Sequence, residues 1–213
     1  MRMPLEKSVP AMTAIVVWFC LGVQLVLIIN QMTGEGATVL EAVWRYFGFF
    51  TILTNIAVAL VATAMVFSKP SFLNNARARM ITAASIALVG FVYSVALRSV
   101  WSPTGWQLVV DRGLHDVSPI MFLLAWYLSH HGKLVWRDAI LAVAAPMAYL
   151  LYAVTRGALD GWYAYWFLDL TQLSTFEFIR NTLLIAFAFC LFALALIALD
   201  KWLARRQSLD QRG

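Results

Sequence analysis

The sequence predicts an all-α membrane protein, a single domain formed by a bundle of six transmembrane helices with both termini in the cytoplasm. Hydrophobic residues make up 62% of the 213 residues and charged residues 13%, and the mean hydropathy is +0.76. This composition excludes an ordinary soluble domain. The second observation is the spacing of the apolar residues, and the third is the distribution of the basic ones.

The apolar residues fall into six blocks of roughly 20 residues, the length with which an α-helix crosses a hydrocarbon core. The sequence lacks the alternating pattern of membrane β-strands, so the blocks are expected to be helices. The connections between them are too short for a separate soluble domain. The blocks cover approximately residues 11–30, 44–67, 80–97, 111–131, 139–155 and 176–199.

The basic residues indicate the orientation of the bundle. Eleven of the sixteen Lys and Arg residues, including every lysine, fall on the side that holds both termini. The other side carries five arginines and seven of the eleven acidic residues. The positive-inside tendency therefore places both termini in the cytoplasm, so the protein is expected to be integral to a membrane. The pI near 9.5 reflects this topology, and we expect no nucleic-acid partner.

The first block follows a charged start with Arg2 and Lys7, as a signal peptide would. Its apolar run is longer than a signal sequence needs, and no small-residue cleavage site follows, so we expect a retained span. Gln24 within it is typical of an interhelical hydrogen bond. The two cysteines, Cys20 and Cys190, show no CxxC spacing, and we expect no disulfide.

The second block contains an unusual polar stretch, FFTILTN. Arg45 marks the outer end of the block, and Thr51 lies six residues further, about 9 Å deeper along a helix. Thr54 and Asn55 follow three and four positions later, so the three polar side chains share one face. The stretch favours a buried polar site. The alternative is that the hydroxyls bond to helical carbonyls while the asparagine packs against a neighbouring helix.

The third block ends at Arg98, and the fourth contains a histidine. We expect the fourth helix to begin near Asp111, which places His115 about one turn inside the membrane, at a depth comparable with Thr51. Asp111 lies four residues before His115 and could orient its ring. Pro119 has no amide to bond the His115 carbonyl, so a kink is expected there. An ionisable residue at this depth is a functional candidate, and the alternative is a structural histidine bonded to a neighbouring helix.

The fifth block leads into an aromatic loop, and the sixth begins with polar residues. The loop RGALDGWYAYWFLDLTQLS, residues 156–174, is either an interfacial aromatic belt or a folded cap over the outer mouth of the bundle. In the sixth block, Arg180 either pairs with Glu177 or points into the site. Asn181 lies beside it.

Thr51 and His115 form the one pair at matched depth that could perform nucleophilic chemistry. A histidine that accepts the hydroxyl proton makes a threonine a competent nucleophile towards an ester carbonyl. Such a reaction also needs hydrogen-bond donors for the oxyanion. The candidates for binding the substrate or the oxyanion are Asn55, Arg98, Asp111, Arg180 and Asn181.

Six short spans, Phe-Phe-Thr ending at Thr51, His115 followed by Pro119, and the loop WYAYWFLD together resemble the androgen-induced membrane hydrolase family and its bacterial relatives. The similarity covers most of the chain. The resemblance implies a threonine hydrolase that cleaves fatty acid esters of hydroxy fatty acids, with Thr51 as nucleophile and His115 as its partner. Thr54 is the alternative nucleophile. We expect a lipid ester as substrate, and no cofactor or metal ion.

A second function class is open on the sequence. The same polar cluster could bind a lipid or another small molecule without cleaving it, in a binding or transport protein. Against a transporter, the six blocks show no convincing internal repeat. A haem protein is disfavoured because the three histidines do not supply paired ligands across the membrane.

Overall fold

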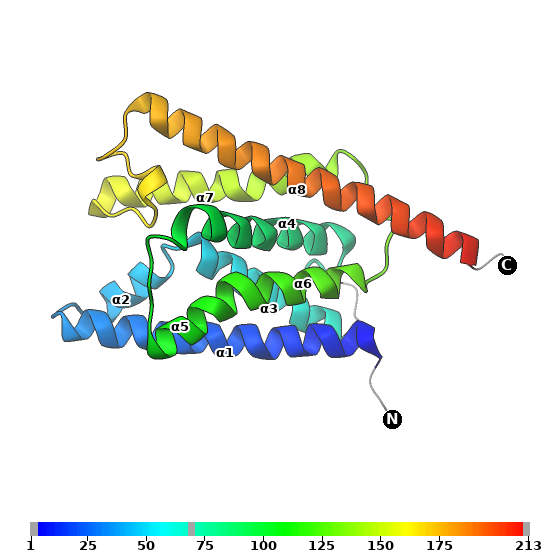
Figure 1. Ribbon diagram of the computed structural model, residues 1–213, viewed down its shortest axis with the longest axis horizontal. Helices are drawn as coiled ribbons and strands as arrows, with labels where there is room; N and C mark the ends of the chain where they lie inside the picture. The colour runs from blue at the N-terminus through cyan, green and yellow to red at the C-terminus, as the bar shows by residue number, and fades with distance from the viewer. Residues whose placement is uncertain (1–3, 68–70, 211–213) are drawn as a thin grey trace.

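The computed structural model describes residues 4–67 and 71–210, and every regular element in this part of the chain is a helix (Figure 1). Five helical segments here are long and apolar enough to cross a membrane. The prediction of an all-α chain with several long apolar helices is therefore confirmed. These segments belong to α1 (Leu5–Gly34), α3 (Phe50–Phe67), α4 (Ala76–Val92) with the π-helical turn η1 (Tyr93–Leu97), α7 (Asp138–Asp160) and α8 (Thr175–Asp210).

The helix expected at 111–131 begins and ends earlier than predicted. It runs through α5 (Gly105–Arg112), the π-helical turn η2 (Gly113–Val117) and α6 (Ser118–Tyr127). The expected start near Asp111 was wrong because the first part, GWQLVVDR, is too polar to be recognised as part of an apolar block. Three charged residues, Asp111, Arg112 and Asp116, lie in the middle of this segment.

The block expected at 44–67 is broken, so the prediction of one continuous helix there was wrong. A short amphipathic helix α2 (Val39–Tyr46) comes first, with a capping box between Thr38 and Glu41. The chain then turns at Gly48 before α3 begins. A Cβ on Gly48 would lie 2.6 Å from the Trp162 ring, so the close packing of the turn requires glycine. The break places Thr51 in the first turn of α3 rather than inside a longer helix.

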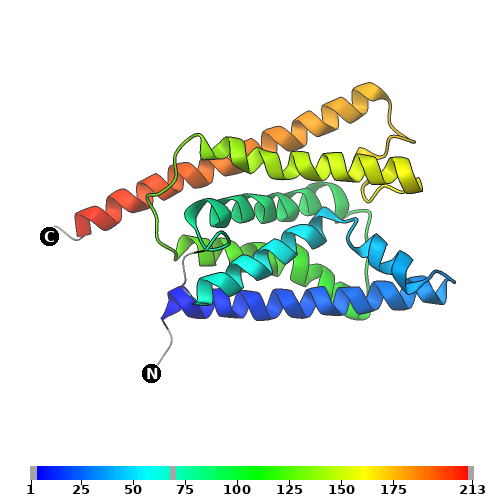
Figure 2. The ribbon, with the colours of Figure 1, turned by 180° about the vertical axis from the view of Figure 1, so that it is seen from behind.

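The helices form two layers with α4 between them, as Figures 1 and 2 show from opposite sides. One layer contains α1, α3 and the segment from α5 to α6, and the other contains α7 and α8. The N-terminal end of α1 and the C-terminal end of α8 lie at the same end of the bundle. The polar site described below lies where the two layers meet α4.

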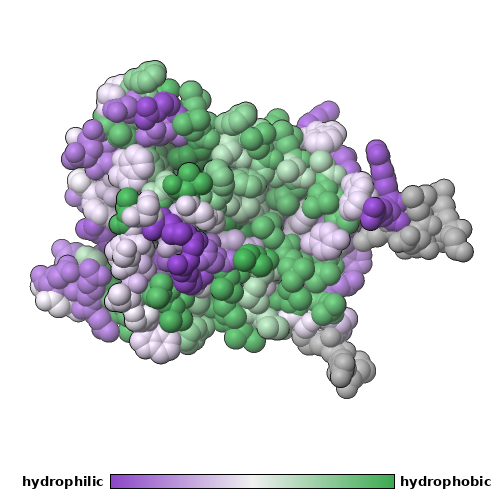
Figure 3. All heavy atoms as spheres, in the orientation of Figure 1, coloured by the Kyte–Doolittle hydropathy of each residue, from purple (hydrophilic) through white to green (hydrophobic). Residues whose placement is uncertain are grey.

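Large apolar side chains cover much of the outer surface. Ile15, Leu124, Ile140 and Leu183 are each more than 45% exposed although they lie on long helices. Figure 3 shows hydrophobic residues mostly over the middle of one face and hydrophilic residues mostly towards its two ends. Such a surface is compatible with a membrane protein, because lipid solvates apolar side chains that water would not.

The aromatic loop after α7 folds back onto the start of α3. Trp162 packs edge-on against Phe49 with ring centroids 5.3 Å apart. The Tyr163 ring packs so closely on Gly157 that a Cβ there would lie 2.1 Å from it. A 3-10 turn, η3 (Trp166–Leu168), follows and leads towards α8. The loop therefore has a defined position over the first turn of α3, as a folded cap would.

Candidate functional site

Thr51 and His115 lie side by side although 64 residues separate them in the sequence. The Thr51 Oγ1 atom lies 3.3 Å from His115 Nε2. Thr51 is 8% exposed and the His115 side chain 15% exposed, so the contact is largely shielded from solvent. The first turn of α3 supplies the hydroxyl, and η2 supplies the imidazole.

Asp111 orients the histidine from its other ring nitrogen. His115 Nδ1 lies 3.0 Å from the Asp111 carbonyl oxygen and 3.3 Å from its carboxylate Oδ1. Because both neighbours are acceptors, we assign the hydrogen to Nδ1. Nε2 is then the unprotonated nitrogen that faces Thr51. Threonine, histidine and aspartate thus lie in the order that a hydroxyl nucleophile, a base and an orienting carboxylate require.

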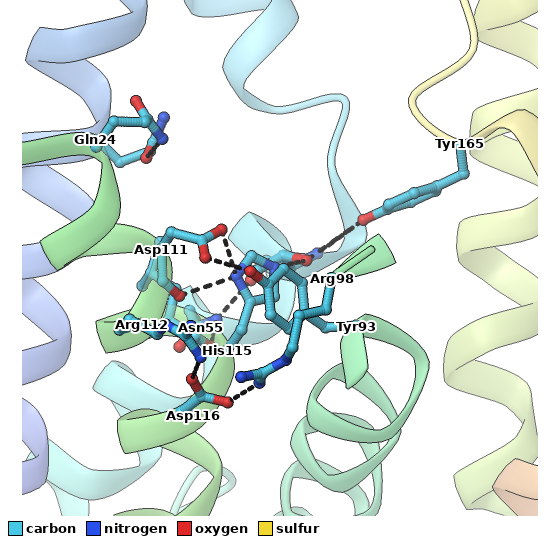
Figure 4. A network of polar contacts seen from close by, with 12 residues as sticks. Gln24, Asn55, Tyr93, Arg98, Asp111, Arg112, His115, Asp116 and Tyr165 are labelled. Carbon is cyan, nitrogen blue, oxygen red and sulfur yellow. Dashed lines mark hydrogen bonds and ion pairs between the residues drawn. The ribbon is translucent and has the colours of Figure 1, made fainter. Parts of the chain in front are cut away.

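Tyr93 is a member of this network that the sequence did not predict. Its ring stacks on His115, with centroids 4.0 Å apart and planes 17° apart. Its hydroxyl donates a hydrogen bond to the Asp111 carboxylate. Figure 4 shows Tyr93, Asp111 and His115 gathered in one cluster. The stacking restricts the ring of His115, and the hydrogen bond holds the carboxylate that orients it.

Two π-helical turns face each other at the site. Tyr93 lies in η1 and His115 in η2, and their rings form the stacked pair. In η2, the amide of Ser118 bonds the carbonyl of Gly113, five residues back, beside the missing amide of Pro119. The helix thus accommodates the expected proline irregularity with a wider turn. The α4 backbone at Gly90 packs closely here, since a Cβ there would lie 3.3 Å from the His115 carbonyl oxygen. Such π-turns are frequent at functional sites.

Asn55 is fully buried and connects two helices instead of pointing into the site. Its Nδ2 group donates to the carbonyl of Thr51 at 2.9 Å and to the carbonyl of Leu114 at 3.2 Å. Both amide hydrogens are therefore engaged, which leaves neither for an oxyanion. The bond to Leu114 fixes the start of α3 against η2, so Asn55 positions the threonine relative to the histidine.

Arg98 lies at the edge of the network. Its guanidinium donates to the Asp116 carboxylate, which also accepts from Arg112 at 3.0 Å. Asp116 therefore pairs with both Arg98 and Arg112. The Arg98 guanidinium also lies over the Tyr93 ring, 4.9 Å from its centroid. These contacts direct Arg98 away from the Thr51 hydroxyl.

The structure does not bring Arg180 and Asn181 to the site. Arg180 is exposed and donates to the side-chain oxygen of Asn181 at 3.1 Å. The Asn181 amide donates to the carbonyl of Phe167 at 3.1 Å and so supports the aromatic loop. Glu177 is not paired with Arg180 as considered above, because its carboxylate forms the N-terminal capping box of α8 with Ser174.

Tyr165 brings a hydroxyl from the aromatic loop to the threonine. This oxygen accepts the Thr51 backbone N–H at 3.3 Å and lies 3.4 Å from Thr51 Oγ1. Amides in the first turn of a helix have no intrahelical partner, so the loop satisfies one of them. Burial raises the pKa of Tyr165 above its ordinary value, which keeps the phenol protonated. In Figure 4 Tyr165 approaches the network from the side opposite Asp111.

Two cavities meet at the Thr51–His115 pair. The first has a volume of about 60 Å³ and is lined mainly by apolar side chains of α3, α4, α7 and α8. The second has a volume of about 370 Å³ and lies among α1, α2, α5 and the aromatic loop. Both are lined by Thr51, Tyr93, Leu97, His115 and Tyr165. Thr51 and His115 therefore lie beside both cavities.

Comparison with known proteins gives no matching family model, no similar curated protein and no similar solved structure. Among the residues 4–67 and 71–210, no group of three or more His, Cys, Asp or Glu side chains is placed to hold a metal ion. The function is therefore inferred from the geometry of the site. The arrangement combines a shielded hydroxyl, an oriented imidazole and two adjoining cavities.

Proposed function

We propose that this chain is a hydrolase of lipid esters that works within the bacterial inner membrane. The observation that carries the proposal is the alignment of Thr51 Oγ1, His115 Nε2 and Asp111 at the junction of the two cavities. Thr51 is the nucleophile and His115 the base. The resemblance to the androgen-induced membrane hydrolases agrees with the same two residues.

The proposed topology has six spans and cytoplasmic termini. In addition to the five long apolar segments, we propose that the helical segment from Gly105 to Tyr127, the fourth along the chain, spans the membrane. Its charged residues pair with one another or face the site. Two observations support this topology. α1 begins and α8 ends at the same end of the bundle, and eleven of the sixteen lysines and arginines fall on the side of the termini in the predicted order of the spans. The site then lies near the outer leaflet.

The reaction proceeds through an acyl-enzyme. His115 Nε2 accepts the Thr51 hydroxyl proton as Oγ1 attacks the ester carbonyl carbon, and the carbonyl electrons move onto oxygen. Collapse of this intermediate breaks the bond to the alcohol oxygen, which takes the proton from the imidazolium. A water molecule, deprotonated by His115, then attacks the acyl carbon, and the bond to Thr51 Oγ1 breaks. This oxygen takes the proton back from the imidazolium as the fatty acid leaves. Asp111 stabilises the imidazolium in both halves of the reaction.

Tyr165 is the proposed donor to the oxyanion. Its hydroxyl accepts the Thr51 amide and lies 3.4 Å from Thr51 Oγ1, which places the phenolic hydrogen beside the point of attack. Two of the polar groups favoured by the sequence donate elsewhere: Asn55 donates both amide hydrogens to carbonyls, and Arg98 donates from Nη2 to Asp116. A donor that is already positioned and shielded from water contributes strongly to stabilising the transition state.

Replacing Tyr165 by phenylalanine is expected to lower kcat by about 100-fold, with little change in KM, because loss of one oxyanion donor affects the transition state more than the bound ester. The matched control is Tyr163→Phe in the same loop. Because the pKa of Tyr165 is raised, wild-type activity is not expected to fall through its ionisation until the pH exceeds the ordinary tyrosine value of about 10. Equal kcat in the two variants would remove Tyr165 from the reaction.

A binding protein without catalysis is the second candidate function. The apolar lining of the first cavity, with Leu88, Val89, Met147 and Ile185, suits an alkyl chain whether or not a bond is cleaved. The two functions differ in one respect that is easily measured. A binder has no use for an oriented base beside a hydroxyl, whereas a hydrolase forms a covalent intermediate there.

The proposed function is tested with detergent-solubilised, purified protein. We expect hydrolysis of a long-chain carboxylic ester and covalent labelling by a fluorophosphonate probe, which reacts with activated hydroxyl nucleophiles. Pre-incubation with the ester should slow the labelling, because both occupy the same site. Folded protein that binds the ester but neither hydrolyses it nor reacts with the probe would establish the binding function instead.

A further inference from the structure

The two cavities that meet at Thr51 differ in chemistry. The first presents alkyl and aromatic side chains almost throughout, as a fatty acyl chain requires. The second is lined by three glutamines, Gln24, Gln31 and Gln107, in addition to aromatic and aliphatic groups. An ester attacked at Thr51 has two parts, and each cavity is placed to take one of them.

The glutamines of the second cavity offer a donor and an acceptor side by side. Gln107 Nε2 donates to Gln24 Oε1 at 2.9 Å, which joins α5 to α1. The Nε2 group of Gln24 and the Oε1 atom of Gln107 make no further bond within the described residues. A hydroxyl group both donates and accepts, so it complements this pair. The pair lies in the same cavity as Thr51 but in its polar part.

The charge of the second cavity is unsuited to an anion. Within the described residues that line it there is no lysine or arginine, and its carboxylate is that of Asp111. Figure 4 shows the neighbouring basic side chains, Arg98 and Arg112, directed at Asp116, with which both form ion pairs. A carboxylate bound here would lose its hydration without gaining a cation, which is strongly unfavourable.

We infer that the second cavity binds the alcohol part of the ester and takes an uncharged, hydroxyl-bearing group of the glycerol type. The acyl chain lies in the first cavity and stays bound to Thr51 when the ester bond breaks. The neutral alcohol receives its proton from His115 and leaves through the second cavity. This inference rests on the proposed function. It separates the chain from the substrate class that the resemblance implies, in which the alcohol part carries a free carboxylate.

The test compares three esters with the same palmitoyl chain in wild-type protein. They are 1-palmitoylglycerol, the palmitoyl ester of a hydroxystearic acid, and the methyl ester of that acid. The last two differ at one group, which is an anionic carboxylate in the acid and an uncharged methyl ester in the other, and release of palmitate is the rate compared. We expect kcat/KM for each neutral ester to exceed that of the free acid by about 10-fold or more. A preference for the free acid over its methyl ester would overturn the inference while leaving the hydrolase function intact.

A variant tests the assignment to this cavity. Gln107→Lys places a cation near the outer end of α5, and we expect it to shift the ratio of free acid to methyl ester towards the acid by about 10-fold. Gln172→Lys, the same change on the exposed aromatic loop, is expected to leave the ratio unchanged. An unchanged ratio in an active Gln107→Lys protein would place the alcohol elsewhere.

A binding measurement separates failure of this inference from failure of the proposed function. Uncleavable ether analogues of 1-palmitoylglycerol and of the hydroxystearic ester are compared by the thermal shift they produce in the wild-type protein. A larger shift with the neutral ether upholds the inference even where no hydrolysis or labelling is seen. A larger shift with the acid ether overturns it.

Discussion

Thr51→Ala is expected to reduce ester hydrolysis to the background rate, a loss of about 10⁴-fold or more, and to abolish labelling by the fluorophosphonate probe. The variant lacks the oxygen that forms the acyl bond. His115 Nε2 contacts Thr51 Oγ1 in the wild type, so in the variant the base has lost the hydroxyl that it activates. Binding of an uncleavable ether should persist, since the cavities retain their remaining lining. Hydrolysis rate, labelling and thermal shift measure the three properties.

The matched control is Thr54→Ala, which also settles the choice between the two threonines. Thr54 is 4% exposed and lies in the next turn of the same helix, so its loss tests general damage to α3. We expect this variant to label and hydrolyse at rates close to wild type. Thr51→Ser should retain part of the activity because it keeps the hydroxyl. Labelling that survives in Thr51→Ala but is lost in Thr54→Ala would reverse the assignment.

His115→Ala is expected to have an effect of similar size, about 10⁴-fold in kcat, because the threonine then has no base to accept its proton. Asp111→Asn should also be severe, at about 10³–10⁴-fold, for a different reason. An asparagine amide donates to Nδ1, which favours the tautomer with hydrogen on Nε2, the nitrogen that must accept the proton. Single-turnover hydrolysis measures both effects without interference from product release.

His130→Ala is the matched control for the histidine change. This histidine is exposed in the connection between α6 and α7, at the end of the bundle away from the site, so its loss should leave kcat unchanged. Equal activity in His115→Ala and wild type would mean that His115 supports the structure without taking part in a reaction. The ring stacking with Tyr93 would then explain its position.

The sequence predicted the polar pair because each residue interrupts an apolar block. Thr51 and His115 stood out by residue type, and the helical period placed Asp111 beside the histidine. Tyr93 could not be predicted in the same way, because a tyrosine in an apolar helix is ordinary and its role depends on which helix packs opposite. Tyr165 lies in the aromatic loop. A loop has no regular spacing of side chains like that of a helix, so the contact with Thr51 could not be derived from the sequence.

The errors in helix boundaries have a common physical cause. Hydropathy detects blocks that are apolar on all sides, and it therefore joined the end of α2 to α3 and missed residues 105–110 of the segment at 105–127. The oxyanion donors were not predictable for another reason. Whether Asn55 or Arg180 points into the site depends on side-chain partners from other helices and loops, as the bonds to Leu114 and Asn181 show.

The most direct test of the account is to locate the covalent adduct. Wild-type protein is treated with a fluorophosphonate, digested, and the modified residue is identified by tandem mass spectrometry. We expect a single adduct on the Thr51 hydroxyl. The amount of adduct should fall when His115 is replaced by alanine, and excess ester should prevent its formation. An adduct on Thr54 or on a serine such as Ser118, or its absence from folded protein that binds the ester, would contradict the claim that Thr51 is the nucleophile.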